Sequence, residues 1–580
     1  MERRSNPKCL CRQAKTACLR PGDSVPFERM TNTVLTLLSA DKLRDYYGAG
    51  YWRDETIYAL VAGHAARTPE KFALRDRFRR LTYRELIAAV DALARDLASR
   101  GVKAGQRVAV WLPSRLESAI AMLACSRNGY TCVPSLHRDH TVLEIVELLE
   151  RTRAAALFAE PGYGADAARH DIFDAAKDVT SLRHVYRVPM LAADAGGPFA
   201  DLPGSSVDAA PNTDPNRVVY LAFTSGTTGV PKGVMHSDNT LLATVRTVAV
   251  DWKLGPDTVV YSLSPLSHNL GMGALFAAML VGGELVVHDL PKGQSLVDRL
   301  TTTGATYLIG VPTHAIDLLS ELRARGLKRL GQVRGFRISG AAAPGEVVAE
   351  LLRYGVVPQS GYGMTETCSH QYTLPGDDPQ RIVETSGRCC AGYELKIWKQ
   401  DNPDAEAPAG EIGQIGGRGA SLMLGYFGDQ AATEESFNAH GWFMTGDLGW
   451  MDEHGYLRVT GRKKDVIIRG GHNIYPARIE ALAMRHAAVE RAAAFPVADA
   501  RLGEKVCLAI TVKDGMSLGP DELLRHLDAA GLSKFDMPEY FLQPDTIPLT
   551  SSGKILKREL VALVRDGRLQ PTPIRWQARG

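Results

Sequence analysis

The stretch FTSGTTGVPKG, residues 223–233, follows the apolar run VVYLA at residues 218–222. The apolar run predicts a strand, and the glycines and hydroxyl side chains after it predict a flexible loop. Glycines in such a loop let backbone N–H groups turn toward an anion with no Cβ in the way, and Lys232 adds a positive charge. The stretch therefore predicts a loop that binds polyphosphate.

This loop is not a Walker A sequence. Lys232 is followed by Gly233 where Walker A has Ser or Thr, and Pro231 stands where a helix would already have begun. An ordinary surface loop rich in Gly, Ser and Thr is the alternative interpretation. The letters nevertheless closely resemble the signature loop of the adenylate-forming superfamily, which contains the acyl-CoA synthetases, the luciferases and the adenylation domains of peptide synthetases.

Four further segments are similar to motifs of the same superfamily and occur in the order that it requires. They are QSGYGMTE at residues 359–366, GWFMTGD at 441–447, GRKKD at 461–465 and PLTSSGK at 548–554. Together with the phosphate loop they extend the resemblance over residues 51–560, approximately. The resemblance implies an enzyme that activates a carboxylate with ATP as an acyl-adenylate, releases pyrophosphate and passes the acyl group to a thiol, most often that of coenzyme A.

The resemblance also assigns roles to individual residues. Lys554 would bridge the substrate carboxylate and the α-phosphate, because attack on a polyanion needs a cation at the junction. Thr365 would donate to the α-phosphate, and Glu366, with Thr224, would hold Mg²⁺, which prefers oxygen ligands. The full set of residues expected to bind ATP or AMP is Thr224, Ser225, Gly226, Thr227, Thr228, Gly229, Lys232, Gly340, Ala341, Ala342, Tyr362, Gly363, Met364, Asp447 and Arg462.

Within that set, Tyr362 would stack on adenine beside the small residues Gly340, Ala341 and Ala342. Asp447 would accept hydrogen bonds from both ribose hydroxyls, and Arg462 would steady the same sugar. An Asp after Thr-Gly is also a common turn residue, so a purely local role for Asp447 stays open.

A second group of expected residues belongs to the thiol step. Lys464 sits where the superfamily has its hinge, so that one rotation exchanges Lys554 for the loop of Gly470, Gly471 and His472 beside a pantetheine channel. Glycines suit a backbone that a thin, uncharged arm must approach closely. A simple β-turn is the alternative interpretation of these glycines.

The acyl pocket is expected between His268 and Tyr362, and it would be lined by His268, Asn269, Met272, Gly310, Val311, Gly340 and Gly363. The sequence offers no Asp for an α-ammonium group and no evident Arg or Lys for a second carboxylate. The acid is therefore expected to be a neutral, apolar monocarboxylate: medium-chain, alicyclic such as cyclohexanecarboxylate, or aromatic. His268 is counted with Lys554 and Thr365 as a catalytic candidate, either as a gate or as a packed histidine.

Composition and charge exclude several classes of protein. The 580 residues are 45% hydrophobic and 23% charged, and the net charge of +3 gives no reason to expect a nucleic-acid partner. The nine cysteines include no CxxC pair, so neither a disulfide framework nor a structural zinc site is expected, and a cytoplasmic location fits best. No membrane span is expected, since the most apolar segment, residues 274–287, is short and interrupted by glycine. The oligomeric state is left open.

The expected fold class is α/β. Residues 1–29 carry six basic side chains before residue 21 and few aliphatic ones, and they are expected to be a disordered tail or to precede the true start at Met30. Residues 30–463 are expected to form a large N-terminal domain of layered α/β sheets plus a β-barrel-like part. Residues 464–580 would form a small mobile α+β domain behind the hinge at Lys464.

Local patterns predict individual elements. Thr82 and Glu85 form a capping box ahead of a helix that Gly101 closes, and Ser114 and Glu117 repeat the pattern before residues 119–125. Strands are expected at residues 107–112, 131–134, 258–263, 284–288, 306–312 and 335–344, and their alternation with helices predicts a parallel sheet. In the C-terminal part helices are expected at residues 477–486 and 521–530, and strands at 492–497 and 506–512.

One segment departs from the superfamily's pattern: residues 387–392, Gly-Arg-Cys-Cys-Ala-Gly, lack the usual prolines. Two other functions compete with an acyl-CoA synthetase. One is an aryl-acid adenylase that loads a carrier protein, and the other, from a different class, is a non-catalytic nucleotide or acyl sensor. The presence of Glu366, Asp447 and Lys554 argues against the sensor.

Overall fold

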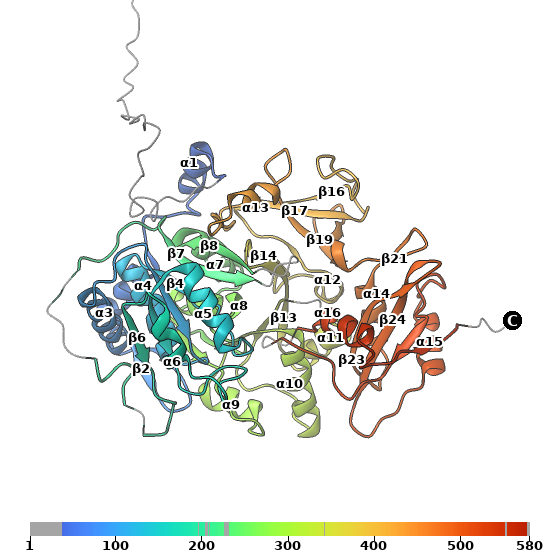
Figure 1. Cartoon of the computed structure of the whole chain (residues 1–580), viewed down its shortest axis with the longest axis horizontal. Coiled ribbons are helices and arrows are strands. Elements are labelled where there is room, and N and C mark those ends of the chain that lie inside the picture. Colours follow the sequence, from blue (N-terminus) through green and yellow to red (C-terminus); the bar gives the residue numbers. More distant parts are fainter. Residues whose placement is uncertain are drawn as a thin grey trace, which may run out of the picture. The chain divides into compact units, whose positions relative to one another are not determined.

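The computed structural model describes residues 37–194, 196–202, 207, 209–224, 231–340, 343–550 and 554–576 (Figure 1). The expected α/β class is confirmed, because helices alternate with strands that form several sheets. The calls on Ser225, Gly226, Thr227, Thr228 and Gly229, on Ala341 and Ala342, and on the tail at residues 1–29 lie outside the described residues.

The first large sheet has nine strands in the order β15-β14-β13-β12-β11-β9-β10-β1-β2. They are β1 (Phe72–Arg75), β2 (Arg80–Thr82), β9 (Val259–Ser262), β10 (Glu284–Val287), β11 (Tyr307–Gly310), β12 (Gly335–Ile338), β13 (Val357–Met364), β14 (Cys368–Tyr372) and β15 (Arg388–Cys389). The six neighbouring strands β13, β12, β11, β9, β10 and β1 pair in parallel. Antiparallel strands follow at both ends of this run. The predicted parallel sheet is therefore present.

The second large sheet has seven strands in the order β18-β8-β7-β4-β3-β5-β6. They are β3 (Arg107–Trp111), β4 (Thr131–Val133), β5 (Ala154–Ala159), β6 (His184–Arg187), β7 (Val218–Thr224), β8 (Lys232–Ser237) and β18 (Gly425–Tyr426). Strands β7 and β8 are antiparallel, and their register pairs Thr224 with Lys232. The two residues that flank the phosphate loop thus face each other across one pair of strands.

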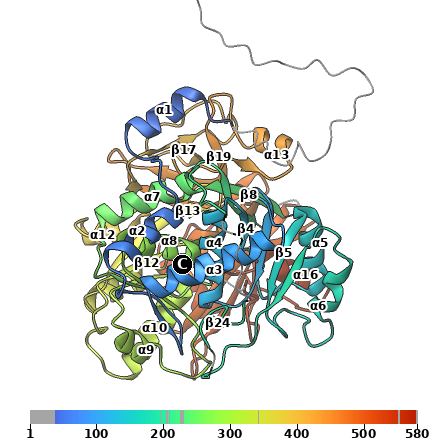
Figure 2. The ribbon, with the colours of Figure 1, turned by 90° about the vertical axis from the view of Figure 1, so that its left-hand side faces the viewer.

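Helices lie between the two sheets and on the outer face of each sheet. A single hydrophobic core joins both sheets to α2 (Ile57–Arg67), α3 (Tyr83–Ser99), α4 (Leu116–Asn128), α7 (Asp238–Asp251) and α8 (Asn269–Val281), and Figure 2 shows α2, α3 and α4 side by side. Every residue of α4 is buried, as expected for a helix enclosed on all sides. The outer faces are covered by α5 (Val142–Thr152) and α6 (Ile172–Ala175) on one sheet, and by α9 (Leu296–Thr303), α10 (Pro312–Ala324) and α11 (Gly345–Arg353) on the other.

Of the two predicted capping boxes, the first is confirmed and the second is wrong. The Thr82 hydroxyl accepts from Glu85 N, and the Glu85 carboxylate accepts from Thr82 N at 2.8 Å. Helix α4 instead begins after Arg115 with no side-chain cap. The reason is tertiary: the Ser114 hydroxyl accepts from Leu266 N at 3.1 Å, and arginines occupy the carboxylate of Glu117.

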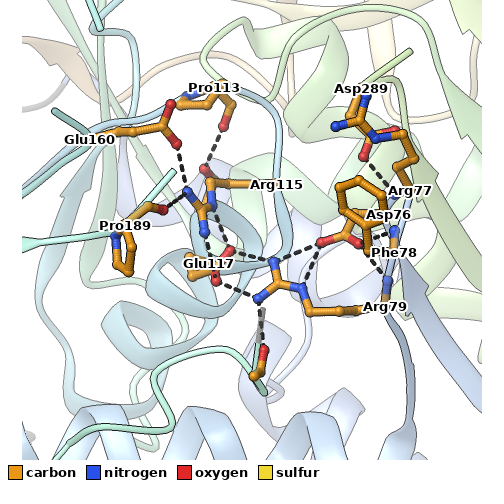
Figure 3. A network of polar contacts seen from close by, with 12 residues as sticks. Asp76, Arg77, Phe78, Arg79, Pro113, Arg115, Glu117, Glu160, Pro189 and Asp289 are labelled. Atoms are coloured by element: carbon orange, nitrogen blue, oxygen red, sulfur yellow. Dashed lines mark hydrogen bonds and ion pairs between the residues drawn. The ribbon is translucent and has the colours of Figure 1, made fainter. Parts of the chain in front are cut away.

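Those arginines belong to a buried ion network, which we call the Glu117 network (Figure 3). Glu117 pairs with Arg79 and with Arg115, each at 2.7 Å, Arg79 also pairs with Asp76 at 2.7 Å, and Arg115 pairs with Glu160 at 2.6 Å. Burial alone would raise the pKa of Glu117, but the hydrogen bonds from the two arginines outweigh it and hold this pKa at about 2. The network ties the β1–β2 turn to the start of α4 and the end of β5.

An antiparallel sheet of four strands follows, in the place of the expected barrel-like part. Its order is β16-β17-β19-β20, with β16 (Tyr393–Trp398), β17 (Gly413–Gly419), β19 (Phe443–Met451) and β20 (Leu457–Arg462). The remaining short helices of the described chain before residue 466 are α1 (Ala40–Gly48), η2 (Ala176–Asp178), α12 (Pro379–Glu384), α13 (Gln430–Glu435) and η3 (Lys463–Asp465).

The C-terminal part has a sheet and a hydrophobic core of its own. Its strands are β21 (Ile467–Arg469), β22 (His472–Ile474), β23 (Val489–Asp499), β24 (Gly503–Val512), β25 (Tyr540–Leu542) and β26 (Thr572–Pro573), and its helices are α14 (Pro476–Ala483), α15 (Pro520–Ala529) and α16 (Lys557–Arg565). Both expected helices and both expected strands are present, and the strands are longer than predicted. Among the described residues no helix is long and apolar enough to cross a membrane.

Candidate active site

Parallel strands deliver the expected acyl residues to one edge of the nine-stranded sheet. His268 follows the end of β9, Gly310 ends β11, and Gly340 follows β12. The carboxyl ends of parallel strands lie at the same edge, where α/β proteins bind ligands. A hydrogen bond of 3.1 Å from Ser339 N to Gly310 O joins two of these ends.

Lys554 reaches this edge from the C-terminal part of the chain. A Cβ built on Gly340 would lie 3.1 Å from Lys554 Cε and 3.7 Å from Nζ, so the lysine fills the space where Gly340 has no side chain. Burial lowers the pKa of Lys554, and the charge of Arg462 lowers it further. No carboxylate of the described residues lies within 4.0 Å of its ammonium group, which leaves the cation available to an anion from outside.

Three residues expected around the nucleoside lie together. The Tyr362 hydroxyl donates to Asp447 Oδ2 at 2.9 Å, and Arg462 Nε lies 3.3 Å from Asp447 Oδ1. The β19–β20 register pairs Asp447 directly with Arg462. Burial raises the pKa of Asp447, while Arg462, Tyr362 and Lys554 oppose that rise. The geometry suits a carboxylate held in place to accept hydrogen bonds from a diol.

The expected metal residue Glu366 is buried and has a neutral partner. The Tyr426 hydroxyl donates to Glu366 Oε1 at 3.0 Å, and Lys232 Nζ lies 4.7 Å from the centre of the Tyr426 ring. Burial raises the pKa of Glu366, and no Lys, Arg or His of the described chain lies within 4.0 Å of its carboxylate. A buried carboxylate without a cation fits Mg²⁺, and the part expected of Thr224 stays a prediction.

Thr365 is anchored through its backbone. His236 Nε2 lies 2.7 Å from Thr365 O, and burial lowers the pKa of His236 to about 4, so the neutral ring donates this hydrogen bond. Two hydrogen bonds close the next turn: Met364 N donates to the Thr367 hydroxyl, and Thr367 N donates to Met364 O. A Cβ on Gly363 would lie 2.1 Å from Cys368 O, so the backbone is packed too closely there for any side chain.

Tyr426 and His236 are functional-site neighbours that the sequence analysis missed. Neither lies in a motif of the resemblance. Tyr426 reaches Glu366 only because β18 pairs with β8, and no local pattern predicts that pairing. His236 lies three residues after the phosphate stretch, but this position alone does not predict a hydrogen-bond partner 129 residues away.

His268 caps a helix and also lies near Lys554 in the candidate site. It caps α8, its Nδ1 accepting from Leu270 N at 3.4 Å. Burial lowers its pKa to about 3, and the charge of Lys554 is the next cause, so the ring is neutral. His137, which the sequence analysis did not name, lies with its ring centre 6.1 Å from that of His268 and its Nδ1 3.0 Å from Ser267 Oγ.

The other expected acyl residues surround this point. Asn269 begins α8, and Met272 is fully buried in the core between the sheets. Val311 N donates to His314 Nδ1 at 3.2 Å, and a Cβ on Gly310 would lie 2.8 Å from the same nitrogen. A Cβ on Gly340 would lie 3.5 Å from Val311 Cγ1, so Val311 and Lys554 approach the same glycine.

The residues expected for the hinge and for coenzyme A lie in the C-terminal part. Lys464 is in η3, and burial followed by the charge of Arg462 lowers its pKa. Gly470 and Gly471 have φ of +57° and +87° and join β21 to β22 as a two-residue hairpin turn, a conformation that suits glycine. His472 Nε2 lies 2.8 Å from Asp536 Oδ1. The turn explains both glycines locally, and their role toward coenzyme A stays a prediction.

Comparisons with known proteins agree with the resemblance. A family model described as AMP-binding enzyme matches residues 61–427, and one described as AMP-binding enzyme C-terminal domain matches residues 478–554. The chain belongs to the AMP-binding enzyme family. Like its curated relatives, this AMP-binding enzyme is an acid–thiol ligase that uses ATP and forms AMP.

Two relatives show the extent of the similarity. A medium-chain fatty-acid–CoA ligase of Escherichia coli is 29% identical over 92% of this chain and 95% of its own length. A ligase of Mycobacterium tuberculosis, 3-[(3aS,4S,7aS)-7a-methyl-1,5-dioxo-octahydro-1H-inden-4-yl]propanoyl:CoA ligase, is 32% identical over 87% of this chain and 98% of its own length. Among solved structures, ATP-bound MatB from Rhodopseudomonas palustris has a TM-score of 0.77 at 27% identity and covers 88% of this chain and 99% of its own.

Proposed function

We propose that this AMP-binding enzyme converts a neutral, mainly apolar monocarboxylic acid to its CoA thioester through an acyl-adenylate. The acid would be medium-chain, alicyclic or aromatic. The observation that carries the proposal is the meeting of Lys554 with Gly340 beside the Tyr362, Asp447 and Arg462 group. A cation from the C-terminal part thereby lies next to the residues proposed to hold the nucleoside.

In the first step a carboxylate oxygen attacks the α-phosphorus of ATP, and the bond from that phosphorus to the bridging oxygen breaks to release pyrophosphate. Lys554 would hold the carboxylate and the α-phosphate together and stabilise the developing negative charge. Asp447 and Arg462 would orient the ribose, and Tyr362 the adenine. Lys232 and Thr224 flank the loop proposed to hold the β- and γ-phosphates.

Glu366 and Thr224 would hold Mg²⁺, which would supply Lewis-acid neutralisation of the phosphate oxygens. Tyr426 keeps one oxygen of Glu366 in position. Burial raises the pKa of this carboxyl group, and a bound cation would oppose that rise.

In the second step the thiolate of coenzyme A attacks the acyl carbon, and the bond from that carbon to the phosphate oxygen breaks to release AMP. We assign the pantetheine arm to Gly470, Gly471 and His472, and the pivot between the two steps to Lys464. A boundary between residues 463 and 464 is part of the proposal, and the gap between the two family-model matches supports it. A cytoplasmic location is also part of it, supported by the free cysteines at 125, 132, 368, 389, 390 and 507.

The test is a panel of acids, from short alkyl chains through cyclohexanecarboxylate and benzoate to long chains, assayed for acid-dependent release of pyrophosphate. Free coenzyme A is then added and thioester is measured by mass. Thioester without any carrier protein is the expected result. Adenylate formation without transfer to coenzyme A would favour an aryl-acid adenylase that loads a carrier protein. Binding of nucleotide with no pyrophosphate from any acid would favour a sensor and overturn the proposal.

A further inference from the structure

Arg337 is a buried arginine without a carboxylate partner. It lies in β12, is 5% exposed, and no Asp or Glu of the described residues lies within 4.0 Å of its guanidinium. Its Nη2 donates to Ser369 O at 3.3 Å, and the Tyr307 hydroxyl is in hydrogen-bonding reach. A guanidinium has five donors, and a buried charge without a counter-charge is costly. The structure thus gives this guanidinium neutral hydrogen-bond partners but no counter-charge among the described residues.

Several buried polar groups near Arg337 have no hydrogen-bond partner. They are both ring nitrogens of His370, the Nε2 of Gln359 and the hydroxyl of Tyr393. Gln359 faces Arg337 in the β12–β13 register, and the His370 ring stacks on Tyr393 with centres 3.9 Å apart. Burial lowers the pKa of His370 to about 3, and the charge of Arg337 is the second cause. Unpaired buried polar groups are rare, so a cluster of them indicates a missing partner.

The guanidinium lies against β13, the strand that contains Gly363, a residue expected to line the acyl pocket, which we also call the acyl path. The β13–β14 register is regular at Gly361 and shifts between Tyr362 and Met364. A Cβ on Gly361 would be 3.8 Å from Arg337 Nη2. The arginine therefore lies beside Gly361, two residues before Gly363 along β13.

Cys368 lies close to Arg337 and also to Asn269, another residue of the proposed acyl path. Burial raises the pKa of its thiol to about 12, and the next causes are the charge of Arg337 and a hydrogen bond with Asn269. Asn269 is the first residue of α8 and a proposed acyl residue. Arg337 and Asn269 thus approach the same cysteine from the sheet and from the helix. The sequence analysis found no Arg or Lys for this pocket, and the fold supplies one.

We infer that the acid carries an oxygen acceptor at the end remote from its carboxylate, and that Arg337 donates hydrogen bonds to this oxygen. The inference rests on the proposed function, since it needs an acid in this path. A carbonyl or hydroxyl oxygen keeps the acid neutral, and a second carboxylate offers the same acceptor with a charge. Arg337 is then a specificity-determining residue, because a site built to bond an oxygen rejects the analogue that lacks it.

The experiment compares acids with one carbon skeleton: cyclohexanecarboxylate, 4-oxocyclohexanecarboxylate and cyclohexane-1,4-dicarboxylate, with octanoate, 7-oxooctanoate and octanedioate as a linear set. The readout is kcat/KM for pyrophosphate release by the full chain. An oxygen-bearing acid is expected to exceed its plain analogue by about 10- to 100-fold, the range for hydrogen bonds to a charged group. A preference for the oxo acid supports the inference with the proposed monocarboxylic acid, and a preference for the diacid supports the inference but replaces the proposed substrate by a dicarboxylate.

Arg337→Met is expected to abolish that preference, so that the ratio of the two kcat/KM values falls to about 1. Arg337→Lys, which keeps the charge, is expected to retain part of it. Arg334→Met is the matched control, because Arg334 lies three residues earlier with an exposed side chain, and its preference is expected to equal that of the wild type. Melting temperature and ATP binding are measured for each variant.

Equal use of plain and oxygen-bearing acids by the wild-type enzyme overturns the inference, whether or not the Arg337 variants fold. The proposed function survives that result, because plain acids still release pyrophosphate. A wild-type preference that persists in Arg337→Met overturns the assignment to Arg337. If no acid of any kind releases pyrophosphate, the proposed function fails and the inference fails with it.

Discussion

The Glu117 network and the candidate active site treat buried charge in opposite ways. In the network, Arg79, Arg115 and Glu117 all have ion-pair partners at 2.6–2.7 Å. In the candidate site, Lys554 and Glu366 have no oppositely charged side chain of the described residues within 4.0 Å, although Asp447 and Arg462 form a pair at 3.3 Å, and Arg337 beside the proposed acyl path has none either. The network neutralises its own charges, whereas these three charges are, in our proposal, neutralised by a substrate or an ion.

The comparison predicts that the network serves stability. Glu117→Gln leaves two buried guanidinium groups with one carboxylate fewer, and it is expected to lower the free energy of unfolding by about 3–5 kcal/mol. Chemical denaturation with a two-domain fit measures the loss. The matched control is Glu70→Gln, which breaks the exposed pair with Arg84 and is expected to cost less than about 1 kcal/mol. If Glu117→Gln instead reduced pyrophosphate release per folded molecule at unchanged stability, the network would belong to the site.

For the site, the comparison predicts loss of rate. Lys554→Ala is expected to slow adenylate formation by about 10²- to 10³-fold, because one preorganised cation is removed from the reacting phosphate. Pyrophosphate release is the readout, and melting temperature is expected to change little. Lys513→Ala serves as the control, a lysine of the C-terminal part whose Nζ donates to Ala487 O. A large loss of stability with a normal rate in Lys554→Ala would remove the distinction between the two regions.

Asp238 is a buried carboxyl group that lies outside the candidate site and has no ion-pair partner among the described residues. Its Oδ1 accepts from Ile57 N and the Ser126 hydroxyl, its Oδ2 has no partner, and burial raises its pKa to about 7. The folded state thus holds a proton that the unfolded state has lost, so stability due to this group is full at low pH and falls as pH rises toward 7. Between pH 5 and pH 8 the wild type is expected to lose about 2–3 kcal/mol relative to Asp238→Asn.

Unfolding of both proteins at several pH values measures this difference. A constant difference from pH 5 to pH 8 would mean that Asp238 is already ionised in the fold. Activity is expected to be equal in the two proteins, because Asp238 lies at the start of α7, against α2 and α4, and not at the sheet edge where Lys554 lies. A buried acid can therefore avoid the need for a partner by keeping its proton, which Arg337 cannot do.

The smallest effect is expected at the hairpin turn of β21 and β22. Gly471→Leu is expected to slow thioester formation by about tenfold and to leave adenylate formation within about twofold, because φ of +87° disfavours a side chain and a leucine there would obstruct the proposed pantetheine arm. Single-turnover measurement of pyrophosphate and of thioester separates the steps. Gly515→Leu is matched in conformation, with φ of +75° and open space around it. Equal loss of both steps in Gly471→Leu would refute the assigned role.

Local patterns predicted the elements well where one helix or strand decides the outcome. The Thr82 capping box and the parallel strands that end at Gly310 and near Gly340 are examples. The pattern at Ser114 and Glu117 failed because partners from other segments took both side chains. Short-range rules cannot register such competition, since leaving buried arginines without a carboxylate costs more than losing a capping bond.

The sequence by itself determined the family, the order of the motifs and the residue types that the chemistry needs. It did so because these features depend on neighbours within a few residues. Only the tertiary structure decided which charges are neutralised. The hydroxyl that holds Glu366 comes from Tyr426, 60 residues away, and the carbonyl at Arg337 from Ser369, 32 residues away. Pairing and burial of charge depend on such distant contacts, and so an arginine without a counter-charge, which we place beside the proposed acyl path, becomes visible only in the fold.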